Sequence, residues 1–193
     1  MNRHLLPLKL LLLLVCCLSS SRLFAQDAAS KPANGPYRNG MVVCATPEAS
    51  KVGADVLKKG GNAVDAAVAV QFALAVTHPE AGNIGGGGFM VYRSGKGKTN
   101  TLDFREKAPA AASVNMYLDS AGNVIPNMSL ATHQASGVPG SVDGMVEAHK
   151  KYGKLKWADL VQPAIDLARN GFTITKRLAG SLNWGDPQFK KLN

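Results

Sequence analysis

The sequence predicts an α/β fold, in which short helices and strands alternate and pack in layers. From residue 41 onward, stretches with helical spacing of apolar residues alternate with short apolar runs of the kind that form strands. Glycine or proline follows most of these stretches, so each element is short. The 193 − 25 = 168 residues after the N-terminal leader are enough to bury a sizeable core.

Residues 1–25 have the pattern of a cleavable secretory signal. A basic start is followed by the apolar run 10–18 and then by serines, and the run is shorter than the roughly 20 residues that span a bilayer. We expect cleavage after Ala25. A lipoprotein anchor on Cys16 or Cys17 is the alternative, although the preceding residues are not the usual small ones. The protein is therefore predicted to be exported, to the periplasm where the host has two membranes.

The net charge of +9 falls to +6 when the signal is removed, because Arg3, Lys9 and Arg22 leave with it and no acid does. The remaining cations are scattered, and no basic run is interleaved with aromatic residues. This pattern does not support nucleic-acid binding.

Cys44 is the only cysteine that remains after signal removal, so no internal disulfide is predicted. Its apolar neighbours indicate a structural thiol in a buried strand rather than a reactive nucleophile. The three histidines outside the signal lack the short spacings of a zinc site, and we expect neither a metal nor another cofactor. These histidines are His78, His133 and His149.

A linker, residues 26–40, precedes the part that we expect to fold, residues 41–193. A short strand is predicted over 41–45, and a helix over 48–59 that a pair of glycines ends. Asn62 is expected to cap a second helix, 63–76. That helix is apolar nearly all round, which is typical of a helix packed on several sides.

Pro79 ends this helix and introduces the glycine loop, residues 85–88. The apolar run 89–92 and the segment 101–104 read as two strands, and residues 94–98 form the turn between them. A β-hairpin is the simplest arrangement of these elements.

The rest of the chain is predicted to be helical after an irregular stretch. Residues 119–123 form a turn before a polar loop, and 136–140 introduce a helix over 141–152. Another helix is expected over 157–169, and a third begins beyond Thr175.

The glycine loop invites comparison with a phosphate-binding loop. That motif needs a strand before the glycines and a helix after them, and the Walker type ends in Gly-Lys-Ser/Thr. Here a helix precedes the loop, and Phe89 and Met90 follow it as a strand. We therefore favour tightly packed structural glycines over a ligand-contacting role.

Arg105 is the main candidate for a binding residue. It lies between Asp103 and Glu106 at the end of a predicted strand. An arginine in this setting commonly forms a partly exposed ion pair. Its planar, always charged guanidinium could equally hold a carboxylate through paired donors. Spacing alone leaves both roles open.

Ser136 follows His133 by three residues, which suggests a nucleophile and its base. The surrounding Ser-Gly-Val-Pro-Gly differs from the Gly-x-Ser-x-Gly elbow, and no strand leads into Ser136. A loop that introduces the next helix is the better interpretation. No complete set of nucleophile, base and orienting group can be assembled from these residues.

Four segments together resemble one family. Gly61–Ala67, His78–Met90, Asp103–Glu106 and Ala135–Gly140 are similar to motifs of bacterial γ-glutamyltransferases, in the same order and at similar spacing. The resemblance covers about residues 41–190. Several long motifs in register are far more specific than any one of them.

The resemblance implies an N-terminal-nucleophile hydrolase fold, an αββα sandwich that would be only partly present in this chain. Members of the family are zymogens that cut themselves into a large and a small subunit, and the new N-terminal threonine of the small subunit is the nucleophile. It attacks the γ-glutamyl amide of glutathione or a related compound. Water, an amino acid or a peptide then accepts the glutamyl group. Arg105 falls on the family arginine that binds the glutamyl α-carboxylate.

None of the threonines in this chain, such as Thr99, Thr101 or Thr132, lies in the family's threonine-rich processing motif. The catalytic residues are therefore expected elsewhere, and this fragment of the large subunit is predicted to be inactive alone. Two alternatives stay open. One is a related γ-polyglutamate or cephalosporin acylase, and the other is a non-catalytic periplasmic module that binds γ-glutamyl compounds.

Overall fold

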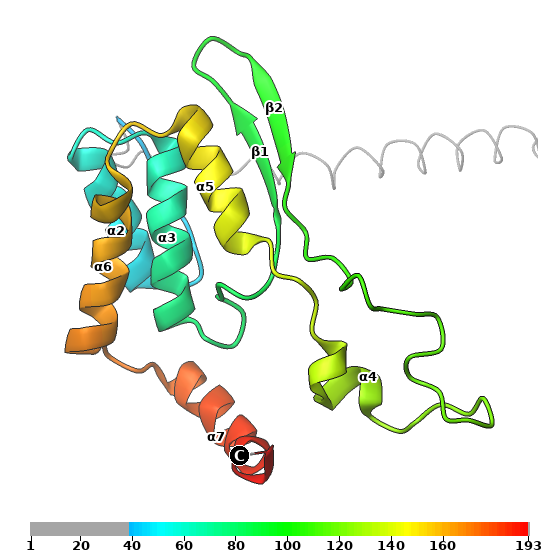
Figure 1. The fold of residues 1–193 in the computed structure, drawn as a ribbon. Helices are drawn as coiled ribbons and strands as arrows, with labels where there is room; N and C mark the ends of the chain where they lie inside the picture. The colour runs from blue at the N-terminus through cyan, green and yellow to red at the C-terminus, as the bar shows by residue number, and fades with distance from the viewer. Residues whose placement is uncertain (1–38, 193) are drawn as a thin grey trace, which may run out of the picture. The chain divides into compact units, whose positions relative to one another are not determined.

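The computed structural model describes residues 39–192 (Figure 1). The predicted signal, 1–25, and all but the end of the predicted linker lie outside the described residues. Gly40–Asn193 make up one folding unit. Among the described residues, no helix is both long and apolar enough to cross a membrane.

The first two helices begin at well-formed caps. α2 (Pro47–Lys58) begins after Thr46, whose hydroxyl accepts from the Ala49 N–H at 3.3 Å. α3 (Ala63–Thr77) begins at Asn62, which forms a capping box with Asp65. Both predicted helices are confirmed to within one residue at each end.

The strand predicted over residues 41–45 is wrong. No described strand lies beside this segment to pair with it, although its side chains alternate between exposed and half-buried. Cys44 is half-buried rather than buried, and its Sγ lies 3.0 Å from Ser50 Oγ. A strand requires a partner for its backbone groups, and periodicity alone does not supply one.

The predicted hairpin is confirmed. β1 (Phe89–Arg93) pairs antiparallel with β2 (Thr99–Asp103), and Met90 lies opposite Leu102 in the register. One face of this two-stranded sheet is half-buried. On the other face Phe89 and Val91 are 65% and 83% exposed.

Four helices follow the hairpin. α4 (Met128–Ala131) and a single 3₁₀ turn, His133–Ala135, lie in the stretch expected to be an irregular loop, so α4 was not predicted. α5 (Ser141–Tyr152) and α6 (Trp157–Asn170) match their predicted ranges closely. α7 (Lys176–Leu192) is the helix expected beyond Thr175.

α2, α3, α5 and α6 pack together, and the hairpin lies alongside α5 (Figure 1). α3 is central to this group, and its many alanines allow its neighbours to approach closely. Phe72 on α3 meets Trp157 on α6 edge to face, with ring centroids 5.6 Å apart. The buried residues of the core are Val56, Ala66, Val68, Ala69, Met145 and Leu160.

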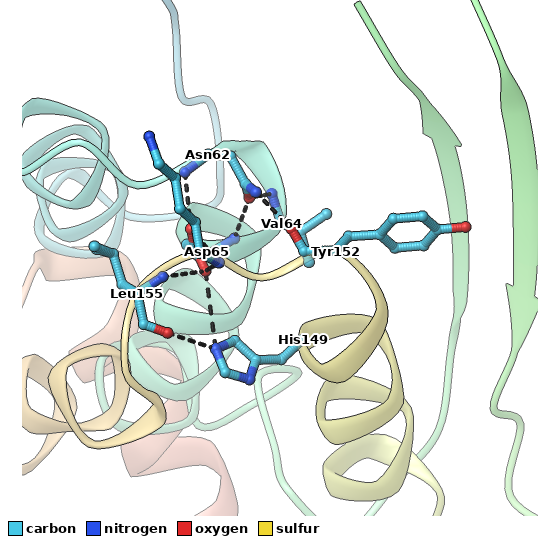
Figure 2. A network of polar contacts seen from close by, with 7 residues as sticks. Asn62, Val64, Asp65, His149, Tyr152 and Leu155 are labelled. Atoms are coloured by element: carbon cyan, nitrogen blue, oxygen red, sulfur yellow. Dashed lines mark hydrogen bonds and ion pairs between the residues drawn. The ribbon is translucent and has the colours of Figure 1, made fainter.

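A buried carboxylate joins the start of α3 to the turn between α5 and α6 (Figure 2). The Asp65 side chain is fully buried and accepts from the Asn62 N–H at 2.8 Å and the Lys154 N–H at 2.9 Å. The Leu155 N–H donates to it at 3.4 Å. His149 Nε2 lies 2.8 Å from the Leu155 carbonyl oxygen, a geometry in which the ring donates. One side chain therefore holds two segments about 90 positions apart.

Candidate functional site

Arg105 lies two residues beyond the end of β2. Its backbone N–H donates to Asp103 Oδ1 at 2.9 Å, which turns the chain as it leaves the strand. Its guanidinium donates to Glu106 Oε1 from Nε at 3.1 Å and from Nη2 at 2.7 Å. The side chain is 59% exposed. Of the two acids that flank it, Arg105 thus pairs with Glu106, and the pair lies at the surface.

The ion pair favours the charged form of both groups. The hydrogen bonds from Arg105 lower the pKa of the Glu106 carboxyl below its ordinary value. The carboxylate in turn raises the pKa of the Arg105 guanidinium. Both side chains are therefore charged at neutral pH, and Glu106 keeps its charge in mild acid.

The glycine loop holds the backbone on one side of Arg105. Gly88 continues the hairpin ladder, since the Phe104 N–H donates to its carbonyl at 3.0 Å. A Cβ added to Gly87 would lie 2.7 Å from the Arg105 Cα and would also meet the Glu106 N–H. Only a residue without a side chain lets the two backbones come this close. The glycines thus have the predicted structural role, since they allow the loop to pack against the segment that carries Arg105.

The loop before α5 also holds this segment, through backbone hydrogen bonds. Lys107 and Val138 exchange two backbone hydrogen bonds, of 3.1 and 2.8 Å. The N–H groups of Gly140 and Ser141 both donate to the Gly86 carbonyl, at 2.8 and 2.9 Å. The glycine loop, the hairpin end and the loop before α5 are therefore hydrogen-bonded to one another.

Phe104 anchors this junction in the helical layer. A Cβ at Gly144, on α5, would collide with the Phe104 ring, and a Cβ at Gly140 would collide with the Phe104 carbonyl oxygen. A Cβ at Gly88 would lie 2.8 Å from the ring. Three glycines thus make room for one aromatic residue, whose position fixes the direction in which Arg105 leaves the strand.

A cavity of about 380 Å³ lies beside Arg105, between the hairpin end and the first turns of α5. Its charged lining residues besides Arg105 are Asp103, Lys107, Asp143 and Glu147. The side-on edge of the guanidinium faces Glu106, whereas Nη1 makes no hydrogen bond with any described residue. Because the side chain is largely exposed, its end-on edge, Nη1 together with the second N–H of Nη2, can donate to a planar anion such as a carboxylate.

The other sequence candidates do not join this site as reactive groups. The Ser136 N–H donates to the His133 carbonyl at 3.2 Å within the 3₁₀ turn, and no described hydrogen bond joins their side chains. The loop leads directly into α5, as predicted. Among residues 39–192, no group of three His, Cys, Asp or Glu side chains has an arrangement that could hold a metal.

Sequence reasoning missed two features of the site. It did not identify Glu106 as the partner of Arg105, although the two are adjacent and opposite in charge. It also did not bring the glycine loop together with Gly137–Gly140, since residues 86 and 140 are far apart in the chain. The small residues in both loops were the available signal, because close backbone approaches require them.

Solved structures resemble this arrangement closely. The chain is similar to "Crystal Structure of Helicobacter pylori gamma-Glutamyltranspeptidase", with 51% identity and a TM-score of 0.77 over 80% of this chain and 44% of that one. The class is therefore the N-terminal-nucleophile hydrolases, as the sequence predicted. Only part of the αββα sandwich is present, since the described residues form a single two-stranded sheet.

The model of the family described as "Gamma-glutamyltranspeptidase" matches residues 49–193, and the chain belongs to this family. A "Glutathione hydrolase proenzyme" of Pseudomonas sp. (strain A14) is 56% identical over 80% of this chain, and one of Escherichia coli (strain K12) is 54% identical over 75% of it. The chain spans only 27% and 25% of the length of these two relatives.

Proposed function

We propose that this chain supplies the glutamyl-binding part of an enzyme that transfers or hydrolyses γ-glutamyl groups, with glutathione as the main donor. Family membership and the names of its relatives support the reaction class. The single observation that carries the site is the open edge of Arg105, presented at a junction of three hydrogen-bonded segments. In this role Arg105 binds the α-carboxylate of the glutamyl group.

The nucleophile in this proposal is a threonine of a small subunit that is cut from the same precursor, and it lies outside the sequence of this chain. Arg105 positions the donor, and the threonine attacks the γ-amide carbonyl to form a glutamyl-enzyme. Water, an amino acid or a peptide then takes the glutamyl group. The protein acts after export, in the periplasm where the host has two membranes.

Arg105 can be tested within a full-length proenzyme that carries this region. Arg105→Ala is expected to raise KM for a γ-glutamyl anilide about 10- to 100-fold, because a charge-assisted pair of hydrogen bonds is lost. Arg105→Lys should recover only part of this loss, since an ammonium cannot match a carboxylate with two parallel donors.

Arg177→Ala is the matched control. Arg177 is also exposed and also donates to a glutamate oxygen at 2.7 Å, that of Glu80. We expect its KM to change less than about twofold. Equal KM values for Arg105→Ala and the parent enzyme would show that Arg105 forms only a surface ion pair and does not bind the donor.

Two further measurements separate the alternative functions. The purified 193-residue chain should not hydrolyse a γ-glutamyl anilide, and measurable turnover would contradict the placement of the nucleophile outside it. Calorimetry with glutamate and glutathione tests the binding-module alternative, which predicts tight binding by this chain alone. Side-by-side kinetics on glutathione, γ-polyglutamate and a cephalosporin substrate would distinguish the related acylases.

A further inference from the structure

The net charge of the described unit is concentrated at one end. This end, here called the basic end, consists of the hairpin turn, the last turns of α2 and α5, the first turns of α3 and α6, and the loop that joins α5 to α6 (Figure 1). All of its Lys and Arg side chains are exposed. They are Lys58, Lys59, Arg93, Lys96, Lys98, Lys150, Lys151, Lys154 and Lys156.

Direct contacts join the segments that make up the basic end. The rings of Tyr92 on β1 and Tyr152 on α5 stack with centroids 4.2 Å apart, and Asn62 at the start of α3 donates to the Tyr152 carbonyl. Lys98 and Lys151 line one open cavity of about 500 Å³. The cations therefore share one surface, although they come from four parts of the chain.

Few acids offset these cations. The basic end contains Asp55, Asp65, Glu147 and Asp159, so nine cations against four acids give a net charge of +5. The rest of residues 40–193 contains eight cations and eight acids, which cancel. The charge of this unit is thus polarised along the hairpin, away from Arg105.

Most of these cations have no carboxylate partner. Only Lys58 and Lys150 form ion pairs among the described residues, with Asp55 and Glu147. The other seven project into solvent at an end where they repel one another. Such a concentration of like charge costs stability unless an anionic partner offsets it.

The chemistry of the basic end favours an extended anionic surface as that partner. Eight of the nine cations are lysines, whose compact, hydrated charges attract anions without the planar recognition that arginine provides. The stacked faces of Tyr92 and Tyr152 are turned toward each other, which disfavours stacking on nucleic-acid bases.

We propose that the basic end docks the protein on the surface of an anionic phospholipid bilayer. Each lysine near such a surface adds to the attraction, and salt weakens it. β2 runs from Thr99 at the basic end to Asp103 beside the Arg105 cavity, so docking leaves that cavity away from the lipid.

Co-sedimentation of the full chain with vesicles tests this surface. We expect binding to phosphatidylcholine vesicles that contain about 30% phosphatidylglycerol, and little binding to pure phosphatidylcholine. Raising NaCl from about 0.05 to about 0.5 M should release the protein. Lys98→Glu combined with Lys151→Glu should weaken binding at least about tenfold, because both lysines face the lipid.

The matched control is Arg169→Glu combined with Lys176→Glu. It changes the net charge by the same four units, but Arg169 lies in the last turn of α6 and Lys176 at the start of α7, outside the basic end. We expect it to weaken binding less than about threefold. Equal losses for the two double variants, salt-independent binding, or tighter binding to duplex DNA than to the anionic vesicles would each overturn the proposal.

Discussion

Gly85 and Gly87 lie two positions apart in the glycine loop but have different surroundings. A Cβ at Gly87 would meet the Glu106 N–H and would lie 2.5 Å from Glu106 Oε2. A Cβ at Gly85 would find no atom within 4 Å. Neither residue adopts a positive φ, so the difference is one of space alone.

Gly87→Ala is therefore expected to lower the free energy of unfolding by about 1–3 kcal/mol, because the Arg105–Glu106 backbone must move to admit the methyl group. Gly85→Ala should change it by less than about 1 kcal/mol, in either direction. Urea unfolding of the two variants measures the contrast. Similar midpoints for both would show that the loop does not pack on the arginine segment as described.

The Arg105–Glu106 pair has a consequence for binding. A carboxylate that approaches the end-on edge of the guanidinium finds Nη1 free and Nη2 shared with Glu106. Glu106 therefore holds the arginine side chain in one orientation and also competes for one of its donors. The ion pair and the carboxylate-binding role, which the sequence left as alternatives, are therefore compatible, since an ion pair can orient an arginine for a ligand.

At the scale of the elements, the buried Asp65 carboxylate links α3 to the loop between α5 and α6 (Figure 2). Asp65→Ala would leave the backbone N–H groups of Asn62, Lys154 and Leu155 without their acceptor. We expect a loss of about 2–4 kcal/mol in the free energy of unfolding, measured with urea.

Asp166→Ala is a suitable control for Asp65→Ala, since Asp166 accepts only an exposed hydrogen bond from Gln162 on its own helix. Its effect should stay within about 0.5 kcal/mol. A small loss for Asp65→Ala would indicate that water satisfies the three backbone groups.

Glu80 joins α7 to the end of α3 and confers a pH dependence on this contact. Its carboxylate interacts with Ser181 and pairs with Arg177 Nη2 at 2.7 Å, and these contacts lower its pKa below the ordinary 4.5. A lowered folded-state pKa means that the stabilisation is present above about pH 4.5 and is lost as the pH falls through the folded pKa.

The attachment of α7 should therefore weaken in acid. We expect the backbone amide of Ser181 to exchange faster with solvent as the pH falls through the lowered pKa of Glu80, after correction for the intrinsic pH dependence of exchange. Glu80→Gln should remove this pH dependence and should give fast exchange at every pH. A corrected rate that is constant with pH in the parent protein would refute the role of the carboxylate.

The helices could be predicted because their signals are local. Asn62 caps α3 and a glycine pair follows α2, and each signal lies within a few residues of the boundary that it sets. The prediction of a strand over residues 41–45 was wrong because a strand needs a hydrogen-bonded partner strand, which the local sequence does not reveal. The role of Asp65 could not be predicted, since its partners Lys154 and Leu155 lie about 90 positions away.

At the scale of the whole described unit, the site lies where three segments distant in sequence converge. Every one of these segments belonged to a motif that the sequence had already singled out, so the composition of the site was largely predictable. Its geometry was not, because it depends on backbone contacts such as that between Gly86 and Gly140. The polarised charge escaped notice for the same reason, since the cations look scattered until the fold gathers them.

The unit also exposes apolar side chains on the outer face of its hairpin. Phe89 and Val91 lie on that face, and Met41 and Val43 are exposed on the extended segment that precedes α2. Unpaired strand edges and exposed apolar residues favour association with another sheet or another copy. The purified chain should therefore self-associate at micromolar concentration, which analytical ultracentrifugation would detect.

Val91→Lys tests whether the hairpin face causes this association. Val91 is 83% exposed and lies opposite Thr101, so a lysine there disturbs little packing but places a charge in the centre of the face. We expect the monomer fraction to rise while the urea midpoint changes little. Ala158→Lys adds the same charge at an exposed position on α6 and should leave association unchanged. If both variants raise the monomer fraction equally, net charge rather than the hairpin face controls association.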